Sequence, residues 1–537
     1  MTTTVIVGGV AGGMSTAARL RRRDEDMEII VLEASGYVSF ANCGLPYHVS
    51  GVIPDRASLL LQTPESLGAR FNLDVRVNTR ATGIDRENKT VTTDTGDVIG
   101  YDHLVLSPGA SPIIPPIPGI ERALHLRTIE DVDGVIAALD ADVETVAIIG
   151  GGFIGLELAE NMRHRGLEVT VIERAPQILT PLDEEMAAIV EKQLTDNGVQ
   201  VITGGDTSTI GEDTLTLSDG RVISADVVVA SIGVRPTSEL AADAGLAIGE
   251  RGGIKVDDQQ RTSDPAIFAV GDAAEKADAI SGEDTLIPLA QTANRHGRLV
   301  ADIITGRDVR RTSTLGTAIV GLFGLAAGSV GWNERRARAA GRNLRVIHVH
   351  PADHAGYYPG AETLHLKLVV DADTDAILGA QAVGGAGVDK RIDVIATAMR
   401  GGLTATDLAD LELAYAPQFG SAKDPINFLG FVNDNMIGGE RTVQWHELED
   451  ARAAGWKLID VRTPGEHEES TIPGAVNIPV DDLRQRAGEL EGAKALVFCR
   501  VGLRGHVAAS LLGNLGIEAA NLDGGFMTWE YTQKARG

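Results

Sequence analysis

Cysteine is the scarcest reactive residue in this chain, with two among 537 residues. Aromatic residues are also few, at 4%, and the 75 acidic residues outnumber the 48 basic ones, for a formal net charge of −27. So few cysteines exclude a disulfide-stapled secreted fold and favour a reducing cytoplasm. The acidic balance argues against nucleic acid as a partner, and any anionic ligand would need a local basic cluster.

Long hydrophobic runs are absent as well. The longest uncharged apolar stretch, residues 317–332, is too short and too rich in glycine to span a membrane. The chain enters a predicted strand at residues 4–7 with no basic and apolar leader before it, so we expect no signal peptide and no membrane partner. The length is sufficient for three or four domains with ample core.

Each of the two cysteines lies in a loop of distinctive composition. Cys43 stands in residues 39–47, SFANCGLPY, and Cys499 opens residues 499–505, CRVGLRG, after an apolar strand. Neither has a neighbour at the spacing of a short disulfide or metal clamp. If both are reactive, the chain carries two separate single-thiol stations whose redox partners come from elsewhere. The alternative is a pair of inert, buried cysteines.

The N-terminal segment has the order strand, glycine turn, helix, strand, acid. A predicted strand over residues 5–7 enters the turn GGVAGG at residues 8–13, a helix follows over residues 14–23, and a strand over residues 28–32 ends in Glu33. This order is typical of a site for an ADP moiety: the glycines admit the pyrophosphate, the helix N-terminus attracts its charge, and the acid accepts from the ribose. Val10 replaces the middle glycine of the motif.

The same order recurs without a departure. A strand over residues 146–149 enters GGGFIG at residues 150–155, a helix follows over residues 156–164, and a strand over residues 169–172 ends in Glu173. Two such motifs in full context are a strong signal, whereas one alone is weak. An acid at position 173 repels a 2′-phosphate and favours NADH over NADPH. Arg174 directly after it leaves that preference open.

Two further segments fit the first motif. Residues 264–273 read as a strand leading to Asp272 at a helix start, where an acid can hold a ribityl hydroxyl of a flavin. Residues 104–110 read as a strand and a crossover toward the second motif. For each segment taken alone, ordinary packing at a strand end is the alternative.

This constellation resembles the flavoprotein disulfide reductases with two dinucleotide-binding domains, over roughly residues 1–435. Within them, the loop around Cys43 is similar to the single-cysteine branch of coenzyme A disulfide reductases, NADH oxidases and persulfide reductases. Two-cysteine relatives carry a second thiol five residues later, where this chain has His48. Cys43 would therefore cycle as a mixed disulfide, a persulfide or a sulfenic acid.

The resemblance implies a relay in which NADH reduces FAD on one face and the reduced flavin returns electrons to Cys43 on the other. Phe153 would gate the flavin face. A thiolate at Cys43 requires positive surroundings, and we expect this residue to head a helix beside the flavin. The cofactor-binding residues implied by the resemblance are Gly8, Gly9, Ala11, Gly13, Glu33, Asn42, Ser107, Gly109, Arg127, Gly271, Asp272, Leu289 and Ala290 for FAD, and Gly150, Gly152, Phe153, Ile154, Gly155, Glu173 and Gly233 for NADH, with NADPH possible.

Coenzyme A, as substrate or bound thiol, is the ligand implied for a second set of residues. Family contacts match Ser15, Arg19, Arg22, Ser39, Asn42 and Asn294 here, with Lys423 in the interface domain. The basic run at residues 19–23 by itself has two explanations: it answers the helix dipole, or it binds an anion. The resemblance favours a phosphate site.

Residues 315–435 resemble the dimerisation domain of the family. Strands are expected over residues 344–350 and 364–370, followed by a helix over residues 388–400. The resemblance implies a homodimer in which Tyr357 and Tyr415 enter the partner's active site beside its cysteine, where a phenol can donate a hydrogen bond or a proton. An aromatic pair that packs a strand end is the alternative.

The C-terminal part, residues 442–535 after a short polar linker at residues 434–439, resembles a single rhodanese domain. Backbone N–H groups of the loop from Cys499 to Arg504 can converge on the sulfur, and together with Arg500 and the following helix start they would stabilise a thiolate or persulfide. Thr471 stands where relatives often carry histidine. Retention of the cysteine favours an active sulfurtransferase.

The predicted fold class is α/β: two Rossmann-like dinucleotide-binding domains, an α+β dimerisation domain and a C-terminal α/β rhodanese domain. We place the FAD domain at residues 1–112 and 250–314 and the NAD(P)H domain at residues 113–249. The leading hypothesis is a cytoplasmic, FAD- and NADH-dependent reductase of coenzyme A persulfide, polysulfide or disulfide, coupled to a sulfur carrier that takes sulfane sulfur donors. The alternatives are an NADH oxidase with Cys43 as sulfenic acid, and a sulfurtransferase whose flavoprotein part is regulatory.

Overall fold

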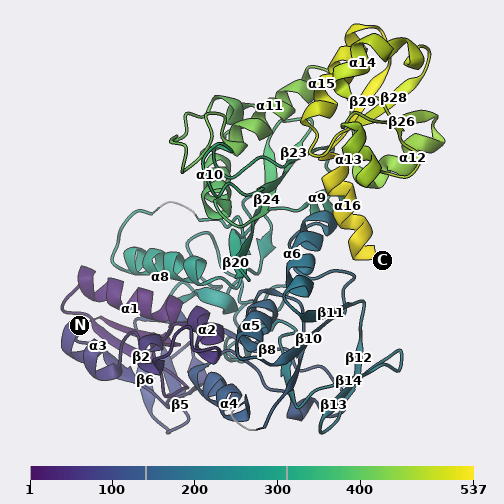
Figure 1. Ribbon diagram of the computed structural model, residues 1–537. Helices are drawn as coiled ribbons and strands as arrows, with labels where there is room; N and C mark the ends of the chain where they lie inside the picture. The colour runs from purple at the N-terminus through teal and green to yellow at the C-terminus, as the bar shows by residue number, and fades with distance from the viewer. Residues whose placement is uncertain (1, 140–141, 310–311, 537) are drawn as a thin grey trace. The chain divides into compact units, whose positions relative to one another are not determined.

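The computed structural model describes residues 2–139, 142–309 and 312–536. The chain forms two compact units: the first comprises Met1–Pro176 and Gly198–Gly316, and the second comprises Gln177–Asn197 and Thr317–Gly537. Both contain mixed helices and strands (Figure 1), which confirms the predicted α/β class. In the part of the chain that the structure describes, no helix has the length and apolar character needed to cross a membrane.

A parallel sheet with both faces covered carries the first dinucleotide motif. Val5 and Ile6 point to opposite faces: Ile6 packs against helix α1 (Ala11–Arg23), and Val5 enters a second core on the other side. This double burial explains why the strand reads as a continuous apolar run. The order is β17-β7-β1-β2-β3, with β1 (Thr3–Val7), β2 (Glu28–Leu32), β3 (Asp74–Arg76), β7 (His103–Leu106) and β17 (Ile267–Ala269).

Helix α8 (Ala290–Ile304) packs closely beside α1. A Cβ atom added to Gly297 of α8 would lie 2.3 Å from the carbonyl oxygen of Gly12, so the contact requires glycine. The hydroxyl of Thr16 in α1 donates to the Gly297 carbonyl at 3.1 Å. This helix pair carries several of the residues assigned to coenzyme A.

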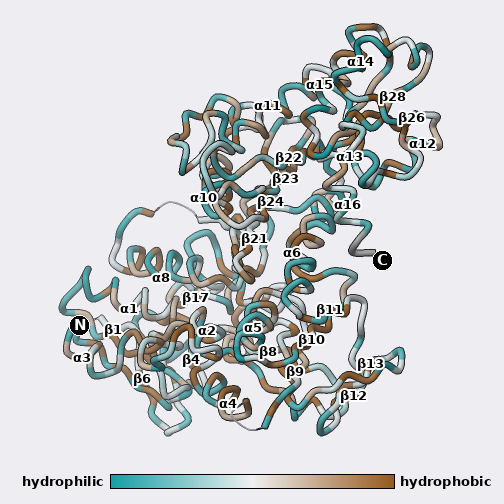
Figure 2. Tube along the Cα trace, viewed as in Figure 1, coloured by the Kyte–Doolittle hydropathy of each residue, from teal (hydrophilic) through white to brown (hydrophobic). Residues whose placement is uncertain are grey.

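A second parallel sheet repeats the arrangement for the second motif. Helix α5 (Phe153–His164) connects two neighbouring parallel strands, as α1 does in the first sheet. The order is β11-β10-β9-β15, with β9 (Thr145–Ile149), β10 (Glu168–Glu173), β11 (Val199–Thr203) and β15 (Val227–Ala230). Brown, hydrophobic stretches in Figure 2 follow such central strands, and exposed loops are mostly teal.

Small antiparallel sheets complete the first unit. One joins β4 (Ala81–Asp85), β5 (Thr90–Thr93) and β6 (Val98–Gly100); another joins β12 (Thr207–Ile210), β13 (Thr214–Leu217) and β14 (Val222–Ser224). Strand β8 (Ala110–Pro112) pairs with β16 (Val234–Pro236), so the two crossings between the dinucleotide motifs run side by side.

The second unit begins with an antiparallel sheet of order β20-β21-β24-β23-β22. Helix α10 (Val388–Gly401) follows it, as predicted, and helix α11 (Pro425–Ile437) comes later in the chain. The strands are β20 (Ala318–Leu322), β21 (Leu325–Gly331), β22 (Leu344–Val349), β23 (His365–Asp371) and β24 (Ile377–Gly384). The predicted strands over residues 344–350 and 364–370 agree with β22 and β23 within one residue.

A C-terminal module within this unit is built on a parallel sheet of order β25-β29-β28-β26-β27. Its strands are β25 (Thr442–Val443), β26 (Trp456–Asp460), β27 (Val476–Asn477), β28 (Lys494–Phe498) and β29 (Ala519–Leu522). Helix α15 (Leu503–Asn514) follows the Cys499 loop, and α16 (Gly525–Arg536) ends the described chain.

One expectation needs correction. The polar linker predicted at residues 434–439 is wrong in its first part, because residues 434–437 form the last turn of α11 and only a short turn remains before β25. Polar side chains on an exposed helix end resemble a linker in sequence. Helix α6 (Glu184–Asp196) groups with the second unit, where its Gln193 side chain donates to the Phe323 carbonyl at 2.7 Å.

Candidate active site

The first glycine turn has the geometry of a nucleotide cradle. Gly8 adopts φ +100°, and a Cβ there would lie 2.0 Å from the Ser107 carbonyl oxygen, so glycine is required. The N–H of Gly9 donates to Glu33 Oε2 at 2.7 Å, and the N–H of Ser35 donates to Oε1 at 2.9 Å. Burial raises the pKa of Glu33, although these backbone donors lower it. The acid is therefore fixed at the strand end, beside the turn.

Val10, the departure from the glycine pattern, does not adopt the positive φ that favours glycine. Its φ of −108° is accessible to any residue, and its carbonyl oxygen accepts the N–H of Met14 at 2.9 Å in the first turn of α1. The third position is different: a Cβ on Gly13 would lie 1.9 Å from the Gly8 carbonyl oxygen. The motif thus keeps glycine where backbone contact demands it.

The second turn repeats this geometry. Gly150 adopts φ +112°, the N–H of Gly151 donates to Glu173 Oε2 at 2.8 Å, and the N–H of Ala175 donates to Oε1 at 2.7 Å. A Cβ on Gly155 would lie 2.1 Å from the Gly150 carbonyl oxygen, whereas a Cβ on Gly152 would face open space. Open space at the middle glycine leaves room for a ligand above the turn. Both motifs therefore fit a dinucleotide.

Residues from four segments gather near the first turn. Arg127 donates to Asp272 at 2.7 Å, and Asp272 stands in the short turn that follows β17. Gly109 adopts φ +76°, and a Cβ there would lie 3.7 Å from the Arg127 guanidinium. The Ser107 N–H donates to the Val7 carbonyl oxygen at 2.7 Å. Leu289 and Ala290 stand where α8 begins.

A small pocket joins residues assigned to the two cofactors. Its lining comes from both dinucleotide motifs and the crossings between them: Pro112, His125, Leu126, Arg127, Ile154, Ala230, Ser231, Gly233 and Val234. Three of these, Arg127, Ile154 and Gly233, were predicted from sequence. The structure therefore brings a residue assigned to FAD and two assigned to NADH to one place.

Lys276 is a buried cation near Asp272 that sequence reasoning missed. Its ammonium donates to the carbonyl oxygens of Gly271 and Ala274 at 2.6 and 2.7 Å. Burial lowers the pKa of Lys276 to about 8, against the charges of Asp272 and Glu275. An isolated lysine in a polar stretch gives no sequence signal for such a position.

Cys43 lies in a short 3₁₀ turn, Asn42–Gly44, directly before helix α2 (Leu45–Val49), which confirms that it heads a helix. The described residues around Cys43 do not supply the positive surroundings that a thiolate requires. Burial raises the pKa of the Cys43 thiol, and the carboxylates of Glu157 and Asp272 raise it further, although the side chain reaches the surface. The chain's own groups therefore favour the thiol over the thiolate.

Glu157 of α5 is the second functional candidate that sequence reasoning missed. Its Oε1 accepts a hydrogen bond from the Tyr47 hydroxyl at 3.2 Å. Burial raises the pKa of Glu157, and the carboxylate in turn raises the pKa of Tyr47 above its usual range, after burial itself. A glutamate four residues after the glycine-turn phenylalanine, on the same helix, was the available signal.

Four of the residues assigned to coenzyme A lie on α1 and α8: Ser15, Arg19, Arg22 and Asn294. The Ser15 hydroxyl donates to Asn294 at 2.5 Å, so these two are brought together. Arg19 is paired with Asp302 at 2.8 Å, which offsets its charge, whereas Arg22 is exposed. Asn42 donates to the Arg127 carbonyl at 3.2 Å.

Ser39 adopts φ +49°, and its N–H donates to the Gly9 carbonyl at 2.8 Å. This bond ties the Cys43 loop to the first glycine turn. A residue assigned to coenzyme A is thereby connected to the FAD cradle within the first unit. The assignment of these residues to a ligand stays a prediction.

The two predicted tyrosines of the second unit form a pair. The hydroxyl groups of Tyr357 and Tyr415 lie 2.8 Å apart, and the side chains are 77% and 48% exposed. The hydrogen bond with Tyr415 raises the pKa of Tyr357. Such exposure is unusual for an aromatic pair that merely packs a strand end. Lys423 is also exposed.

The Cys499 loop forms a cradle around sulfur. Cys499 is buried, at 1% exposed, and the N–H of Gly502 points at its Sγ atom at 3.2 Å. Gly502 adopts φ +96° and precedes the first turn of α15. Arg504 in that turn is fixed by two bonds of 2.7 Å to Glu466, whose hydrogen bonds raise the pKa of Arg504, with a smaller contribution from Cys499. Arg500 is exposed.

Two supporting residues of this module, Glu466 and Asp460, were not singled out from sequence. Glu466 forms a capping box with Thr463 as well as its pair with Arg504, and a T-x-x-E pattern was the signal available. Thr471, the departure from the histidine of relatives, donates to buried Asp460 at 2.9 Å. Asp460 lies opposite Phe498, the residue before Cys499, so the threonine has a structural partner beside the loop.

Comparison with protein families accounts for three parts of the chain. Residues 2–297 match the model described as pyridine nucleotide-disulphide oxidoreductase, residues 317–424 match the dimerisation domain of that group, and residues 444–532 match a rhodanese-like domain. The first match alone covers more than half of the 537 residues.

Curated relatives match about four fifths of the chain. An NADH oxidase of Methanocaldococcus jannaschii is 34% identical over 79% of this chain and 96% of the relative. A coenzyme A disulfide reductase of Staphylococcus aureus strain JH9 is 34% identical over 80% of this chain and 98% of the relative.

Solved structures match nearly the whole chain. Reduced CoADR-RHD of Bacillus anthracis has a TM-score of 0.97 at 45% identity and covers 99% of this chain and 98% of that one. An NAD-dependent persulfide reductase from A. fulgidus has a TM-score of 0.93 at 37% identity and covers 98% of this chain and 100% of that one. In both comparisons the C-terminal module is included.

Proposed function

Because the chain belongs to the pyridine nucleotide-disulphide oxidoreductase family, we propose that it reduces coenzyme A persulfide, polysulfide or disulfide at Cys43 and carries sulfane sulfur at Cys499. One observation carries the proposal: two free thiols stand in separately built loops, one beside two dinucleotide cradles and one in a rhodanese-like cradle. Similarity over the whole chain to a persulfide reductase supports persulfide as the substrate.

The enzyme uses FAD and a pyridine nucleotide, as its family does. Bound flavin supplies the two-electron step between nicotinamide and sulfur. The residues that would hold it are the turn at Gly8 and Gly9, the carboxylate of Glu33 and the Arg127–Asp272 pair. The turn at residues 150–155 and Glu173 would hold the nucleotide, and the carboxylate favours NADH over NADPH.

The chemistry at Cys43 is a sulfur exchange followed by reduction. The thiolate attacks a coenzyme A persulfide, an S–S bond to Cys43 forms, the original S–S bond breaks, and one sulfur leaves as a thiolate or as hydrosulfide. Two electrons from NADH then cleave the new bond. The sum is R–S–SH + NADH + H⁺ → R–SH + H₂S + NAD⁺, and a disulfide gives two thiols instead.

Binding of coenzyme A is proposed along α1 and α8. The Ser15–Asn294 pair offers a hydroxyl and an amide, and Arg22 offers an exposed cation for a phosphate. Arg19 is the weaker phosphate ligand, because Asp302 already offsets its charge. We also propose a homodimer, supported by the match to a dimerisation domain, in which Tyr357 and Tyr415 serve the partner's site and Lys423 lies near it.

The two other candidate functions are less well supported. An NADH oxidase needs no sulfur carrier, and the NADH oxidase relative covers 79% of this chain. A sulfurtransferase with a regulatory flavoprotein part does not need the second glycine turn, at residues 150–155, in which backbone hydrogen bonds hold Glu173. The two free cysteines favour a cytoplasmic location, which stays a prediction.

The test is an anaerobic assay of NADH oxidation with coenzyme A persulfide and, separately, coenzyme A disulfide, with sulfide measured in parallel. We expect persulfide to give one sulfide for each NADH consumed. Turnover with the disulfide alone would make the enzyme a thiol reductase with an ancillary carrier. Turnover with neither, together with oxygen uptake in air, would support the oxidase.

Single-cysteine variants separate the two stations. Cys43→Ser should abolish sulfide release while thiosulfate sulfurtransfer at Cys499 persists. Cys499→Ser should leave reduction of preformed coenzyme A persulfide intact and lower polysulfide reduction. Full polysulfide activity in Cys499→Ser would contradict the carrier role.

A further inference from the structure

His348 of strand β22 holds the C-terminal module from within the dimerisation domain. Its ring Nδ1 lies 2.6 Å from Asp523 Oδ2, and its backbone N–H donates to the same oxygen at 3.0 Å. Gln444 donates to that oxygen at 3.1 Å and to the Val346 carbonyl at 3.0 Å. Three donors therefore converge on one carboxylate oxygen that is buried where the two parts of the second unit meet.

Asp523 begins the turn that lies directly behind the Cys499 loop. Gly524 and Gly525 follow it with φ +67° and +66°. The next two N–H groups, of residues 526 and 527, donate to the carbonyl oxygens of Cys499 and Arg500 at 2.8 and 2.9 Å. A change in the position of Asp523 would thus pass through two residues to the backbone that carries the sulfur.

Gly524 and Gly525 leave no room for a side chain at either end of this connection. A Cβ on Gly525 would lie 2.4 Å from the Cys499 carbonyl oxygen and 2.9 Å from the Gly502 nitrogen, the donor to the sulfur. A Cβ on Gly524 would lie 2.9 Å from the Cβ of His348. The backbone of this turn therefore touches His348 on one side and the sulfur loop on the other.

The other ring nitrogen of His348 is held as well. Nε2 lies 2.9 Å from Glu185 Oε1 of helix α6. With a carboxylate at each nitrogen, both nitrogens act as donors and the ring is an imidazolium. Burial alone would lower the pKa of His348, but Asp523 and Glu185 raise it to about 9, against the charge of Lys367. The ring is thus charged and fixed in orientation at neutral pH.

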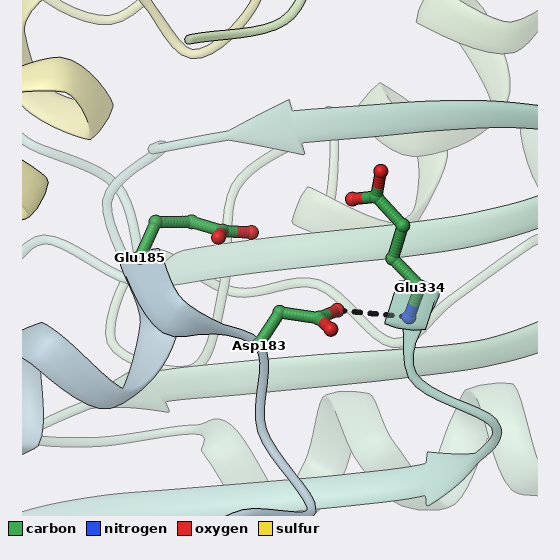
Figure 3. A group of neighbouring side chains, drawn as sticks. All are labelled: Asp183, Glu185 and Glu334. Atoms are coloured by element: carbon green, nitrogen blue, oxygen red, sulfur yellow. Dashed lines mark hydrogen bonds between the residues drawn. The ribbon is translucent and has the colours of Figure 1, made fainter. Parts of the chain in front are cut away.

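Glu185 belongs to a cluster of buried acids, with Asp183 and Glu334, shown in Figure 3. Carboxylate oxygens this close together resemble a cation site, but the ammonium of Lys367 lies 2.9 Å from Asp183, 2.8 Å from Glu334 and in contact with Glu185. A lysine therefore fills the cluster. The cluster serves to hold Glu185, and through it His348.

A neighbouring histidine shows what an ordinary buried histidine looks like here. His350, two residues on, contacts the Thr528 hydroxyl at 2.8 Å and His365 at 2.9 Å. Burial and the neighbouring histidines lower the pKa of His350 well below its usual range. His350 is therefore neutral, whereas His348 is charged. Of these two histidines, only His348 binds the turn behind Cys499.

We propose that His348 is a positioning residue for the sulfur-carrier loop: it holds Asp523 and, through the two glycines that follow, fixes the backbone that aims the Gly502 N–H at Cys499. The proposal rests on the proposed role of Cys499 as a sulfur carrier. The dimerisation domain thereby supplies a residue that positions the Cys499 loop of the rhodanese-like domain.

The test measures alkylation of Cys499 in the full-length chain carrying Cys43→Ser, which leaves one thiol. An asparagine at position 348 places its amide near the Nδ1 position and keeps the bond to Asp523, whereas a glutamine places it near Nε2 and keeps the bond to Glu185. Both remove the same charge. His348→Gln should slow the alkylation of Cys499 at pH 7 about tenfold, which is the effect of one lost hydrogen bond to a charged group. The pH profile of the alkylation rate should move to higher pH. His348→Asn should stay within about twofold.

Equal rates in both variants and the parent, or equal slowing in both, would overturn the proposal. Asp523→Asn is the second variant, and it decides the matter should the histidine variants fold poorly. It should slow alkylation as His348→Gln does, and the double variant should show no further loss. An unchanged rate in Asp523→Asn would overturn the proposal.

The readout is independent of the proposed function. Alkylation reports the state of the loop and needs no sulfur substrate. If Cys499→Ser retained full polysulfide activity, the carrier role would fail while the alkylation results still stood. If the alkylation results failed, the carrier role would be unaffected.

Discussion

Replacing Lys367 by methionine tests whether the buried charges hold the second unit together. The ammonium is fully buried and lies 2.9 and 2.8 Å from Asp183 and Glu334, in contact with Glu185. At an effective dielectric of about 20, each such pair is attractive by about 6 kcal/mol before desolvation is subtracted. Methionine keeps the volume of the side chain and leaves the three carboxylates without their shared cation.

The net loss of stability is smaller than this attraction, because the lysine and the three carboxylates have already lost their hydration when the parent folds. Removing one partner of a buried ion pair typically lowers the free energy of unfolding by about 3–5 kcal/mol. In a unit of this size each kcal/mol shifts the melting temperature by about 2–4 °C, so we expect a fall of about 6–20 °C. Differential scanning calorimetry of the full-length chain measures it.

The pH dependence gives a second, sharper signature. In the parent, burial raises the pKa values of Glu185 and Glu334, but Lys367 and the other partners lower both below their ordinary value. Without the lysine, burial dominates and the folded state binds protons more tightly than the unfolded state. Stability of Lys367→Met should therefore fall as pH rises above about 4.5, the ordinary pKa of these carboxyl groups, whereas Glu185 and Glu334 give the parent no such slope.

Lys192→Met is the matched control. It removes a lysine of helix α6, the helix that carries Glu185; this lysine pairs with Asp196, but the two side chains are 44% and 54% exposed. An exposed pair contributes about 0–1 kcal/mol, so this variant should melt within about 2 °C of the parent. Equal melting temperatures for the two variants, or no pH slope in Lys367→Met, would refute the reasoning.

Three further predictions concern the redox part. Glu157→Gln should lower the pKa of Cys43 and speed its alkylation at pH 7, since the carboxylate raises that pKa after burial does; an unchanged rate in a chain lacking the other thiol would contradict this. Glu173→Ala should raise kcat/KM for NADPH relative to NADH by about tenfold or more, because the fixed carboxylate repels a 2′-phosphate; steady-state kinetics with both nucleotides measures the ratio, and an unchanged ratio would assign the preference elsewhere. Tyr415→Phe should lower the pKa of Tyr357, because their hydrogen bond raises it; a difference spectrum of tyrosine ionisation follows the change, and a spectrum identical to the parent's would show that the pair does not persist in solution.

Local patterns allowed most of the first unit to be predicted. The order strand, glycine turn, helix, strand, acid depends on neighbouring residues, and the bonds from Gly9 to Glu33 and from Gly151 to Glu173 realise it twice. Tyr357 and Tyr415 were singled out as well, from a resemblance rather than from spacing, and their hydroxyl groups lie 2.8 Å apart. Where the chemistry is encoded within some thirty residues, the sequence is sufficient.

The failures concern contacts between distant segments. Residues 434–437 read as a linker because their polar side chains face outward from a helix end. The buried acids Asp183 and Glu185, at the start of helix α6, pair with Lys367, far along the sequence, and no local pattern indicated this contact. A buried lysine or histidine looks like any surface residue until its partners are known.

The thiol of Cys43 illustrates how such a failure bears on mechanism. Glu157 raises the pKa of Cys43, and by reciprocity of linked protonation the Cys43 thiolate raises the pKa of Glu157 by the same coupling. Burial already raises the pKa of Glu157, and the Tyr47 hydroxyl donates to it at 3.2 Å. When Cys43 gives up its proton to attack sulfur, the proton affinity of this carboxyl group therefore rises in response. Glu157→Gln fixes that carboxyl in its uncharged form, so it should speed the attack and remove its dependence on the protonation of residue 157.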